Sequence, residues 1–227
     1  MTISLSSVRS PTEAYDRLVK DVALRKQELV NLRAALGGSS ARSSFLSRSA
    51  LLLAYSHVEG ATKTALAILF GRLNGSGLTW KSVDARLLTF EIDWRLRRIS
   101  LSGMRRLICD DETTVFLRTS QDRRIQVDID GMIGNIGTPN AVNMRTILAA
   151  CGIDPNRYET ELEFLDDRQL SRRHELAHGS LRPVDLSEAR DAVDRAMTLL
   201  EFLLTDFGNL LVLETYRNHG HPSAEVS

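Results

Sequence analysis

The sequence predicts an all-α protein. Apolar residues recur at helical spacing in several long segments, typical helix starts and stops bracket those segments, and strand-like alternation is weak. The chain has 227 residues, enough to bury one good core, and its 43% apolar and 26% charged residues are ordinary for a globular protein. Its 29 basic and 29 acidic side chains cancel, so the net charge points to no particular partner, although a local basic face can still exist. We expect a single domain, residues 1–227, with an insertion in its middle.

The first helix is expected to begin after Ser10. Ser10 can cap it, Pro11 suits the first helical position, and Glu13 completes a capping box. Apolar residues then recur at helical spacing until Gly37, which ends the segment. This helix and the one after it form the N-terminal pair that we expect over residues 10–74.

The second helix is expected from about residue 44 to residue 74. Three polar side chains interrupt its most apolar part, so it resembles a buried core helix more than a membrane span: His57, Glu59 and Lys63. Glu59 falls on an apolar stripe, where an unpaired carboxylate is unfavourable. It therefore either forms a structural ion pair or helix cap, or helps to orient the residues of a functional site.

Residues 78–137 are expected to form an irregular insertion. A helix over residues 94–108 would carry four arginines opposite its apolar side: Arg95, Arg98, Arg105 and Arg106. Such a face can follow the phosphate backbone of a nucleic acid, and it can equally be a solvated helix surface. Three glycines predict a loop near the end of the insertion: Gly131, Gly134 and Gly137.

Helices are expected again over residues 138–217. A short helix is followed by one that ends at Gly179 and by a final helix from Ser187 to about Tyr216. The remaining residues, 218–227, are expected to be a flexible tail.

The two cysteines, Cys109 and Cys151, indicate a reducing environment. The first ten residues lack the apolar run of a secretory signal. We therefore expect a cytoplasmic protein with both thiols buried and with no membrane segment.

Residues 171–179, which read Ser-Arg-Arg-His-Glu-Leu-Ala-His-Gly, concentrate the chemistry of the chain. On a helix, His174 and His178 would share a face one turn apart with Glu175 beside them. Zinc peptidases hold two metal ligands and a general base in this way. One interpretation of the segment is therefore a zinc hydrolase.

The zinc interpretation lacks a recognisable third ligand. Leu181 and Val184 stand where the extended zinc pattern has Gly and His. Glu188 and Glu201 remain as downstream candidates, but neither lies in a recognisable context. Gly179 also ends the helix directly after the second histidine.

Taken from Arg173 instead, the same residues resemble the Arg-x4–6-His motif of the HEPN ribonucleases. Four residues separate Arg173 from His178, a polar residue follows the arginine, and Gly179 follows the histidine. HEPN families commonly read Arg-Asn-x-Ile-Ala-His-Gly here, so His174 replaces the usual Asn. Upstream, residues 55–60 read Tyr-Ser-His-Val-Glu-Gly. This segment is similar to an aromatic, Glu and Gly pattern of the MAE-type HEPN group.

The resemblance implies a bundle of long antiparallel helices and a metal-independent endoribonuclease that acts on RNA as a homodimer without a cofactor. The ribose 2′-OH would attack the adjacent phosphate. His178 would carry the acid–base chemistry, Arg173 would bind the phosphate, and His174 would position these groups or the RNA. Family context includes toxins and phage-defence effectors, some with a neutralising antitoxin or a defence partner. The alternative is a non-catalytic module that binds RNA, a nucleotide or a protein partner.

The spacing of the motif favours a dimer. Residues five apart lie about 140° apart around a straight helix of 3.6 residues per turn. One helix therefore presents Arg173 and His178 poorly to a single phosphate. Two such helices that meet across a two-fold axis would surround one groove with both pairs.

Overall fold

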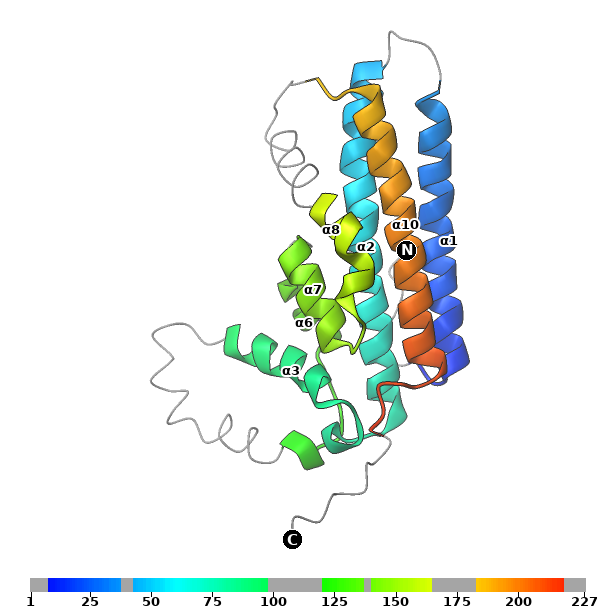
Figure 1. The fold of residues 1–227 in the computed structure, drawn as a ribbon. Helices are drawn as coiled ribbons and strands as arrows, with labels where there is room; N and C mark the ends of the chain where they lie inside the picture. Colours follow the sequence, from blue (N-terminus) through cyan, green and yellow to red (C-terminus); the bar gives the residue numbers. More distant parts are fainter. Residues whose placement is uncertain (1–7, 38–42, 98–119, 137–139, 165–182, 219–227) are drawn as a thin grey trace.

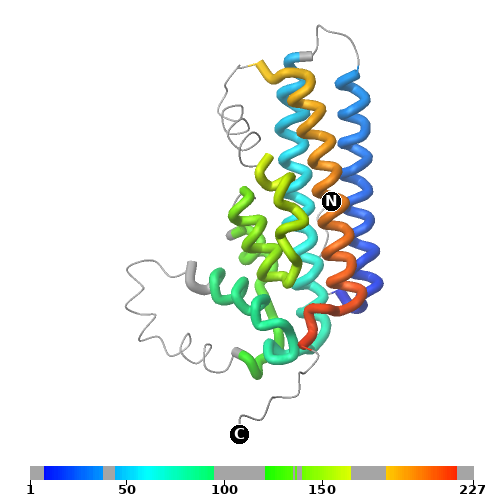
Figure 2. Tube along the Cα trace, viewed as in Figure 1, coloured from blue at the N-terminus to red at the C-terminus, as the bar shows by residue number. Residues whose placement is uncertain are grey.

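Three long helices form the body of the molecule. The computed structural model describes residues 8–37, 43–97, 120–136, 140–164 and 183–218. The long helices are α1 (Pro11–Ala35), α2 (Ser43–Ser76) and α10 (Leu186–Val212), and each packs against the other two (Figures 1 and 2). The described residues include no strand and only two isolated bridges, so the predicted all-α class is confirmed.

The three long helices do not all run in the same direction. Figure 1 shows α1 antiparallel to both α2 and α10, whereas α2 and α10 run in the same direction. The shorter central helices lie between α2 and α10 in the sequence and carry the chain part of the way back toward the end where α2 begins. The first half of α10 therefore lies beside the first half of α2.

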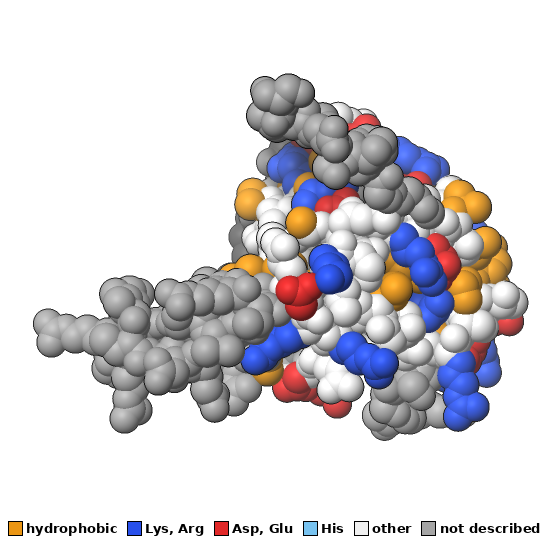
Figure 3. All heavy atoms as spheres, turned by 90° about the horizontal axis from the view of Figure 1, so that it is seen from below, with side chains coloured by type: hydrophobic (Ala, Val, Ile, Leu, Met, Phe, Trp, Pro, Cys, Tyr) orange, Lys and Arg blue, Asp and Glu red, His pale blue; other side chains and the backbone are white. Residues whose placement is uncertain are grey.

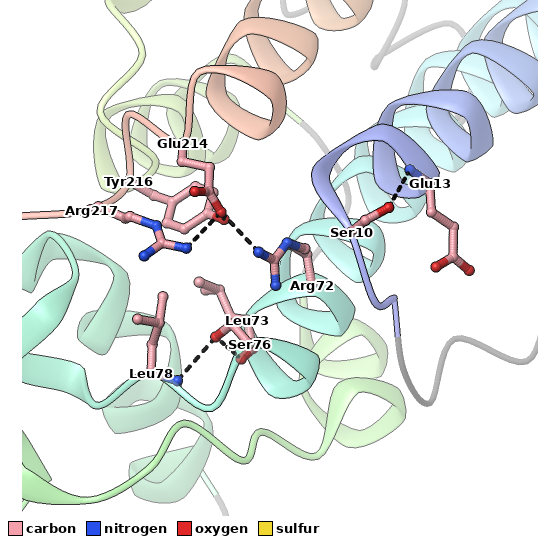
Figure 4. Close-up of polar contacts among 9 residues, drawn as sticks. All are labelled: Ser10, Glu13, Arg72, Leu73, Ser76, Leu78, Glu214, Tyr216 and Arg217. Atoms are coloured by element: carbon pink, nitrogen blue, oxygen red, sulfur yellow. Dashed lines mark hydrogen bonds and ion pairs between the residues drawn. The ribbon is translucent and has the colours of Figure 1, made fainter.

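Helix α1 begins as the sequence predicts. Ser10 is its N-cap, and the side-chain oxygen of Ser10 accepts a hydrogen bond of 3.1 Å from the backbone N–H of Glu13 (Figure 4). Pro11 occupies the first turn, and the Glu13 carboxylate accepts from the backbone N–H of Arg9 at 2.9 Å. These bonds satisfy N–H groups that a helix start otherwise leaves without partners.

Replacing Ser10 by Ala is expected to lower the free energy of unfolding by about 1 kcal/mol, because one N–H of the first turn loses its acceptor. Urea unfolding followed by circular dichroism measures the change. Ser187→Ala is the matched control, since Ser187 is exposed in the first turn of α10 and is not its N-cap. The control should change the free energy of unfolding by less than about 0.5 kcal/mol. Equal losses in both variants would show that the loss in Ser10→Ala does not come from the cap.

Helix α2 is the central helix of the core. Six consecutive residues, 65–70, are all buried, so its second half is covered on every side. This confirms the prediction of a buried core helix. None of the helices in the described part of the chain combines the length and apolar character needed to cross a bilayer.

The central part of the chain folds into short helices against α2 and α10. They are η1 (Trp80–Ser82), α3 (Ala85–Arg97), η3 (Ser120–Asp122), α6 (Ile129–Asn135), α7 (Ala141–Ala150), η4 (Pro155–Tyr158) and α8 (Glu159–Phe164). The helix expected from Trp94 begins earlier, at Ala85, because Leu87 is already buried in its first turn. Residues 98–108 of that expected helix lie outside the described residues.

The predicted loop around Gly131 and Gly134 is wrong, because both glycines lie inside α6. Asp128 caps this helix by accepting a 3.1 Å hydrogen bond from the backbone N–H of Gly131. A side chain at position 131 would place its Cβ 2.9 Å from the indole nitrogen of Trp94. The glycine is therefore needed for close packing against α3, not for a turn.

The chain after α10 is anchored to the junction between α2 and α3. The final helix ends at Val212, not near Tyr216, and Glu214 then adopts a positive φ of 49°. Two hydrogen bonds of 2.8 Å fix the segment: Asp84 N–H donates to the Tyr216 carbonyl, and the Asn218 side-chain amide donates to the Val83 carbonyl. Asn218, the first residue of the expected flexible tail, is thus held, and residues 219–227 lie outside the described residues.

Candidate functional site

The residues predicted to carry the chemistry fall mostly outside the described part of the chain. Residues 165–182 contain the motif histidines and arginine: Arg173, His174 and His178. Three of the predicted RNA-binding arginines also lie outside it: Arg98, Arg105 and Arg106. Arg95 belongs to α3, but its side chain is not described. The structure therefore defines the two attachment points of the motif segment and the surroundings of Glu59.

Arg195 of α10 holds the end of α8, immediately before the motif segment. Its guanidinium lies 4.3 Å from the centroid of the Phe164 ring and donates to the Glu161 carboxylate at 3.0 Å. A planar cation can stack on an aromatic face and bind a carboxylate at the same time. The last described residue before the motif segment, Phe164, is thereby fixed against the first half of α10.

Helix η4, which precedes α8, is also held against α10. Asp206 accepts a 2.7 Å hydrogen bond from the Tyr158 hydroxyl and forms a 2.7 Å ion pair with Arg157. The Arg157 guanidinium also lies 4.5 Å from the centroid of the Phe202 ring. Burial, reinforced by the Asp206 carboxylate, raises the pKa of Tyr158 well above its ordinary value, so the hydroxyl stays a hydrogen-bond donor.

The motif segment rejoins the described chain at the start of α10. Val184 is buried, and Asp185 occupies the N-cap position with an extended backbone. The segment therefore connects two points that both lie on the first half of α10. Sequence reasoning did not identify Arg195, because nothing near it in the sequence indicates that it contacts Phe164.

Glu59 lies on α2 and forms an ion pair within its own helix. Its carboxylate is 2.7 Å from the Lys63 ammonium, and its side chain is 23% exposed. The structural ion pair, one of the two predicted alternatives, is present. A supporting role for Glu59 at the functional site stays a prediction.

The neighbours of Glu59 in the Tyr-Ser-His-Val-Glu-Gly segment join α2 to α1. His57 Nε2 lies 3.2 Å from the Glu28 carboxylate of α1. Burial lowers the pKa of His57 most strongly; Glu28 and Asp21 raise it and Arg25 lowers it further. A side chain at position 60 would place its Cβ 2.3 Å from the Arg25 guanidinium, so Gly60 makes room for that arginine.

A metal site is not indicated by the described side chains. Among them, no three His, Cys, Asp or Glu residues are grouped so as to hold a metal ion. This finding does not bear on His174, Glu175 and His178, which lie outside the described residues. The zinc and HEPN interpretations are therefore distinguished by the family to which the whole chain belongs.

A family model described as MAE_28990-like HEPN matches residues 14–216. The chain belongs to the HEPN superfamily. No curated protein and no solved structure matches it at a significant level. The resemblance based on the motif and residues 55–60 is thus confirmed at the level of the family.

The match extends over the whole bundle of this HEPN protein, from the first turns of α1 to the segment after α10. It includes Glu59 and the Arg173–His178 motif. HEPN domains are often ribonucleases, and family membership favours the Arg-x4-His interpretation over the zinc one. Family membership does not by itself show that this chain cleaves RNA.

Proposed function

We propose that this HEPN protein is a metal-independent endoribonuclease whose site is assembled from two copies of the motif segment. The observation that carries the proposal is an Arg-x4-His motif inside a chain that matches a HEPN family along most of its length. The attachment of both ends of the segment to one long helix supports it, because a fixed scaffold helps to position catalytic groups.

The proposed reaction is a transesterification within the RNA strand. His178 of one subunit accepts the proton of a ribose 2′-OH, whose oxygen then forms a bond to the adjacent phosphorus. The bond from phosphorus to the 5′ oxygen breaks, and His178 of the partner subunit donates a proton to the leaving oxygen. Histidine suits both steps because its pKa is near neutrality. The products are a 2′,3′-cyclic phosphate and a 5′-hydroxyl.

Arg173 has a different task in this scheme. Negative charge builds up on the phosphate oxygens in the transition state, and a guanidinium stays charged and can donate to two of them. His174 would position the RNA or the other two groups, and Glu59 would support them. Arg95, Arg98, Arg105 and Arg106 are the proposed contacts to the RNA backbone. The proposed biological setting is that of a toxin or phage-defence effector, with an antitoxin or a defence protein as its partner.

Incubating the purified protein with total RNA, with and without EDTA, tests the reaction class. We expect the same cleavage in both samples and fragments that end in 2′,3′-cyclic phosphate, detected by end-group analysis. Loss of cleavage on chelation, with recovery on adding zinc, would instead support a hydrolase that uses His174, Glu175 and His178. RNA binding without any cyclic-phosphate product would support a non-catalytic binding module.

A further inference from the structure

A groove of about 550 Å³ lies between the start of α1 and the end of α10. The residues that line it belong to these two helices, except Leu213, which directly follows α10. Among the described elements, α1 packs mainly against α2 and α10, and the short helices lie on the other side of the bundle (Figure 1). A further helix can therefore pack into this groove without displacing a described element.

The groove exposes apolar side chains from both helices. Tyr15 of α1 is 37% exposed, and at the end of α10 Val212 is 49% and Leu213 63% exposed. Figure 3 shows hydrophobic side chains gathered on the side of the molecule where these helices lie. A Cβ at position 208 would lie 3.0 Å from the Tyr15 ring, so Gly208 lets this ring lie close against α10. Large exposed apolar side chains around a groove are typical of an interaction surface.

A smaller and more polar cavity adjoins the groove. Its volume is about 330 Å³, and Asn209 lines both. Two carboxylates and one cation line this cavity: Asp154, Asp206 and Arg157. The 2.7 Å ion pair with Arg157 compensates the charge of Asp206. Asp154 accepts the backbone N–H of Asn156 at 3.0 Å and forms no ion pair with a described residue, so its charge is uncompensated beside the apolar groove.

We propose that this surface docks a helix of a protein partner, with apolar side chains on one face of the helix and a lysine or arginine beside them. The groove follows α10 from Leu204 to Leu213, about 14 Å at 1.5 Å per residue. A docked helix covers this length with apolar residues at positions i, i+3 or i+4, and i+7. Its cation lies at the Asp154 carboxylate, where the charges are complementary.

Two other occupants match this surface less well. A nucleic acid would bring phosphates next to Asp154, and like charges repel. A second copy of the chain, joined by a two-fold axis through this surface, has to match the surface with itself. The only cation that lines the groove or the cavity is Arg157, and Asp206 already pairs with it. The surface therefore offers no unpaired cation to meet Asp154.

The docking surface is far from the start of α10. Leu204 is about 27 Å along α10 from Leu186, the first residue of the helix, to which the motif segment leads. The inference therefore goes beyond the proposed function and does not depend on RNA cleavage. A helix docked in the groove should leave the rate of cleavage unchanged.

Selection from a display library of random 16-residue peptides tests the chemistry of the occupant. The full-length protein should enrich peptides that combine apolar residues at i, i+3 or i+4, and i+7 with a lysine or arginine. Fluorescence anisotropy then gives the dissociation constant of each selected peptide, made synthetically. Enrichment of acidic peptides, or of peptides without this apolar spacing, would overturn the inference.

Substitutions at the end of α10 locate the bound peptide. Val212→Glu and Leu213→Glu should each raise the dissociation constant of a selected peptide at least tenfold, because an apolar contact is replaced by a charge. The matched control is Leu24→Glu, since Leu24 is 62% exposed on α1 and does not line the groove. Binding to Leu213→Glu as tight as to the wild type, with circular dichroism showing an intact fold, would place the peptide elsewhere and refute the docking surface.

A charge substitution tests the position of the cation. Asp154→Asn should raise the dissociation constant about two- to fivefold at low salt, and the difference should shrink as salt is added. The control is Asp130→Asn, which neutralises an exposed carboxylate of α6 that lines neither the groove nor the cavity. Equal effects of the two variants would contradict a cation at Asp154.

Sedimentation of the protein without peptide distinguishes the remaining occupant. Leu213→Glu should sediment as the wild type does. Conversion of a wild-type dimer to a monomer by this substitution would show that a second copy fills the groove, and would overturn the inference. RNA cleavage is measured separately: its absence would refute only the proposed nuclease.

Discussion

His178→Ala is expected to lower the rate of RNA cleavage by about 10²- to 10⁴-fold, the usual contribution of a positioned general acid or base. The loss should appear in the rate of cyclic-phosphate formation under single-turnover conditions, with RNA affinity nearly unchanged. Arg173→Ala should lower the same rate by about 10²- to 10³-fold, because the developing charge on the phosphate loses a fixed donor. Arg173→Lys should recover little of it, since an ammonium cannot donate to two oxygens in the same geometry.

The matched control for the histidine is His221→Ala, which removes an imidazole outside the residues matched by the HEPN family model. Circular dichroism and sedimentation should show that all these variants keep the fold and the assembly of the wild type. Full activity in His178→Ala would remove this residue from the mechanism. If His221→Ala lost as much activity as His178→Ala, the loss could not be assigned to the motif.

Glu214→Ala is expected to lower the free energy of unfolding by about 3 kcal/mol, because it leaves a buried arginine without its partner. One carboxylate oxygen of Glu214 accepts from Arg72 at 2.8 Å, from the Tyr216 hydroxyl at 2.7 Å and from Arg217 at 2.9 Å (Figure 4). The Arg72 side chain is only 7% exposed, and its Nε has no hydrogen-bond partner among the described residues, so Arg72 depends strongly on this carboxylate. Chemical denaturation measures the loss.

Asp122→Ala is the control for Glu214→Ala. Asp122 forms a 2.7 Å ion pair with Lys81, but the two side chains are 75% and 63% exposed. An exposed pair of this kind contributes about 0–1 kcal/mol. Similar losses in the two variants would show that burial of Arg72 does not determine the stability of the cluster.

The contribution of Glu214 should also depend on pH. Burial raises the pKa of Glu214, but Arg217, Tyr216 and Arg72 together outweigh burial and hold the pKa below its ordinary value of 4.5. A group with a lowered pKa in the folded state stabilises the protein above the pKa of the unfolded state, and this stabilisation is lost as the pH falls. The difference in stability between the wild type and Glu214→Ala should therefore be complete above about pH 4.5 and should shrink below it.

Local patterns accounted for the helices whose ends depend on nearby residues. Ser10, Pro11 and Glu13 predicted the start of α1, and Glu13 N–H indeed donates to Ser10. The glycines after residue 74 placed the end of α2 within two residues of its observed last residue, Ser76. Caps and stops act within one turn of helix, so they can be recognised without the rest of the fold.

Local patterns failed where packing overrides propensity. Gly131 looks like a loop residue, but Trp94 needs the space that a side chain at position 131 would fill, so the residue lies in a helix. The extent of α10 was overestimated, because Tyr216 is a buried residue of the segment after the helix and not of the helix itself. In both cases the sequence showed the character of the residue, flexible at Gly131 and apolar at Tyr216. It did not show to which structural element the residue belongs.

The sequence by itself determined the all-α class and the HEPN family, because helical periodicity and short motifs are encoded by neighbouring residues. The roles of Arg173 and His178 in the motif stay a prediction. Only the tertiary structure decided that α10 runs parallel to α2, that Arg195 fixes Phe164 ahead of the motif, and that Glu214 pairs with Arg72 from 142 positions away. These contacts join residues distant in sequence, and no local pattern specifies which distant side chains will be brought together when the helices pack.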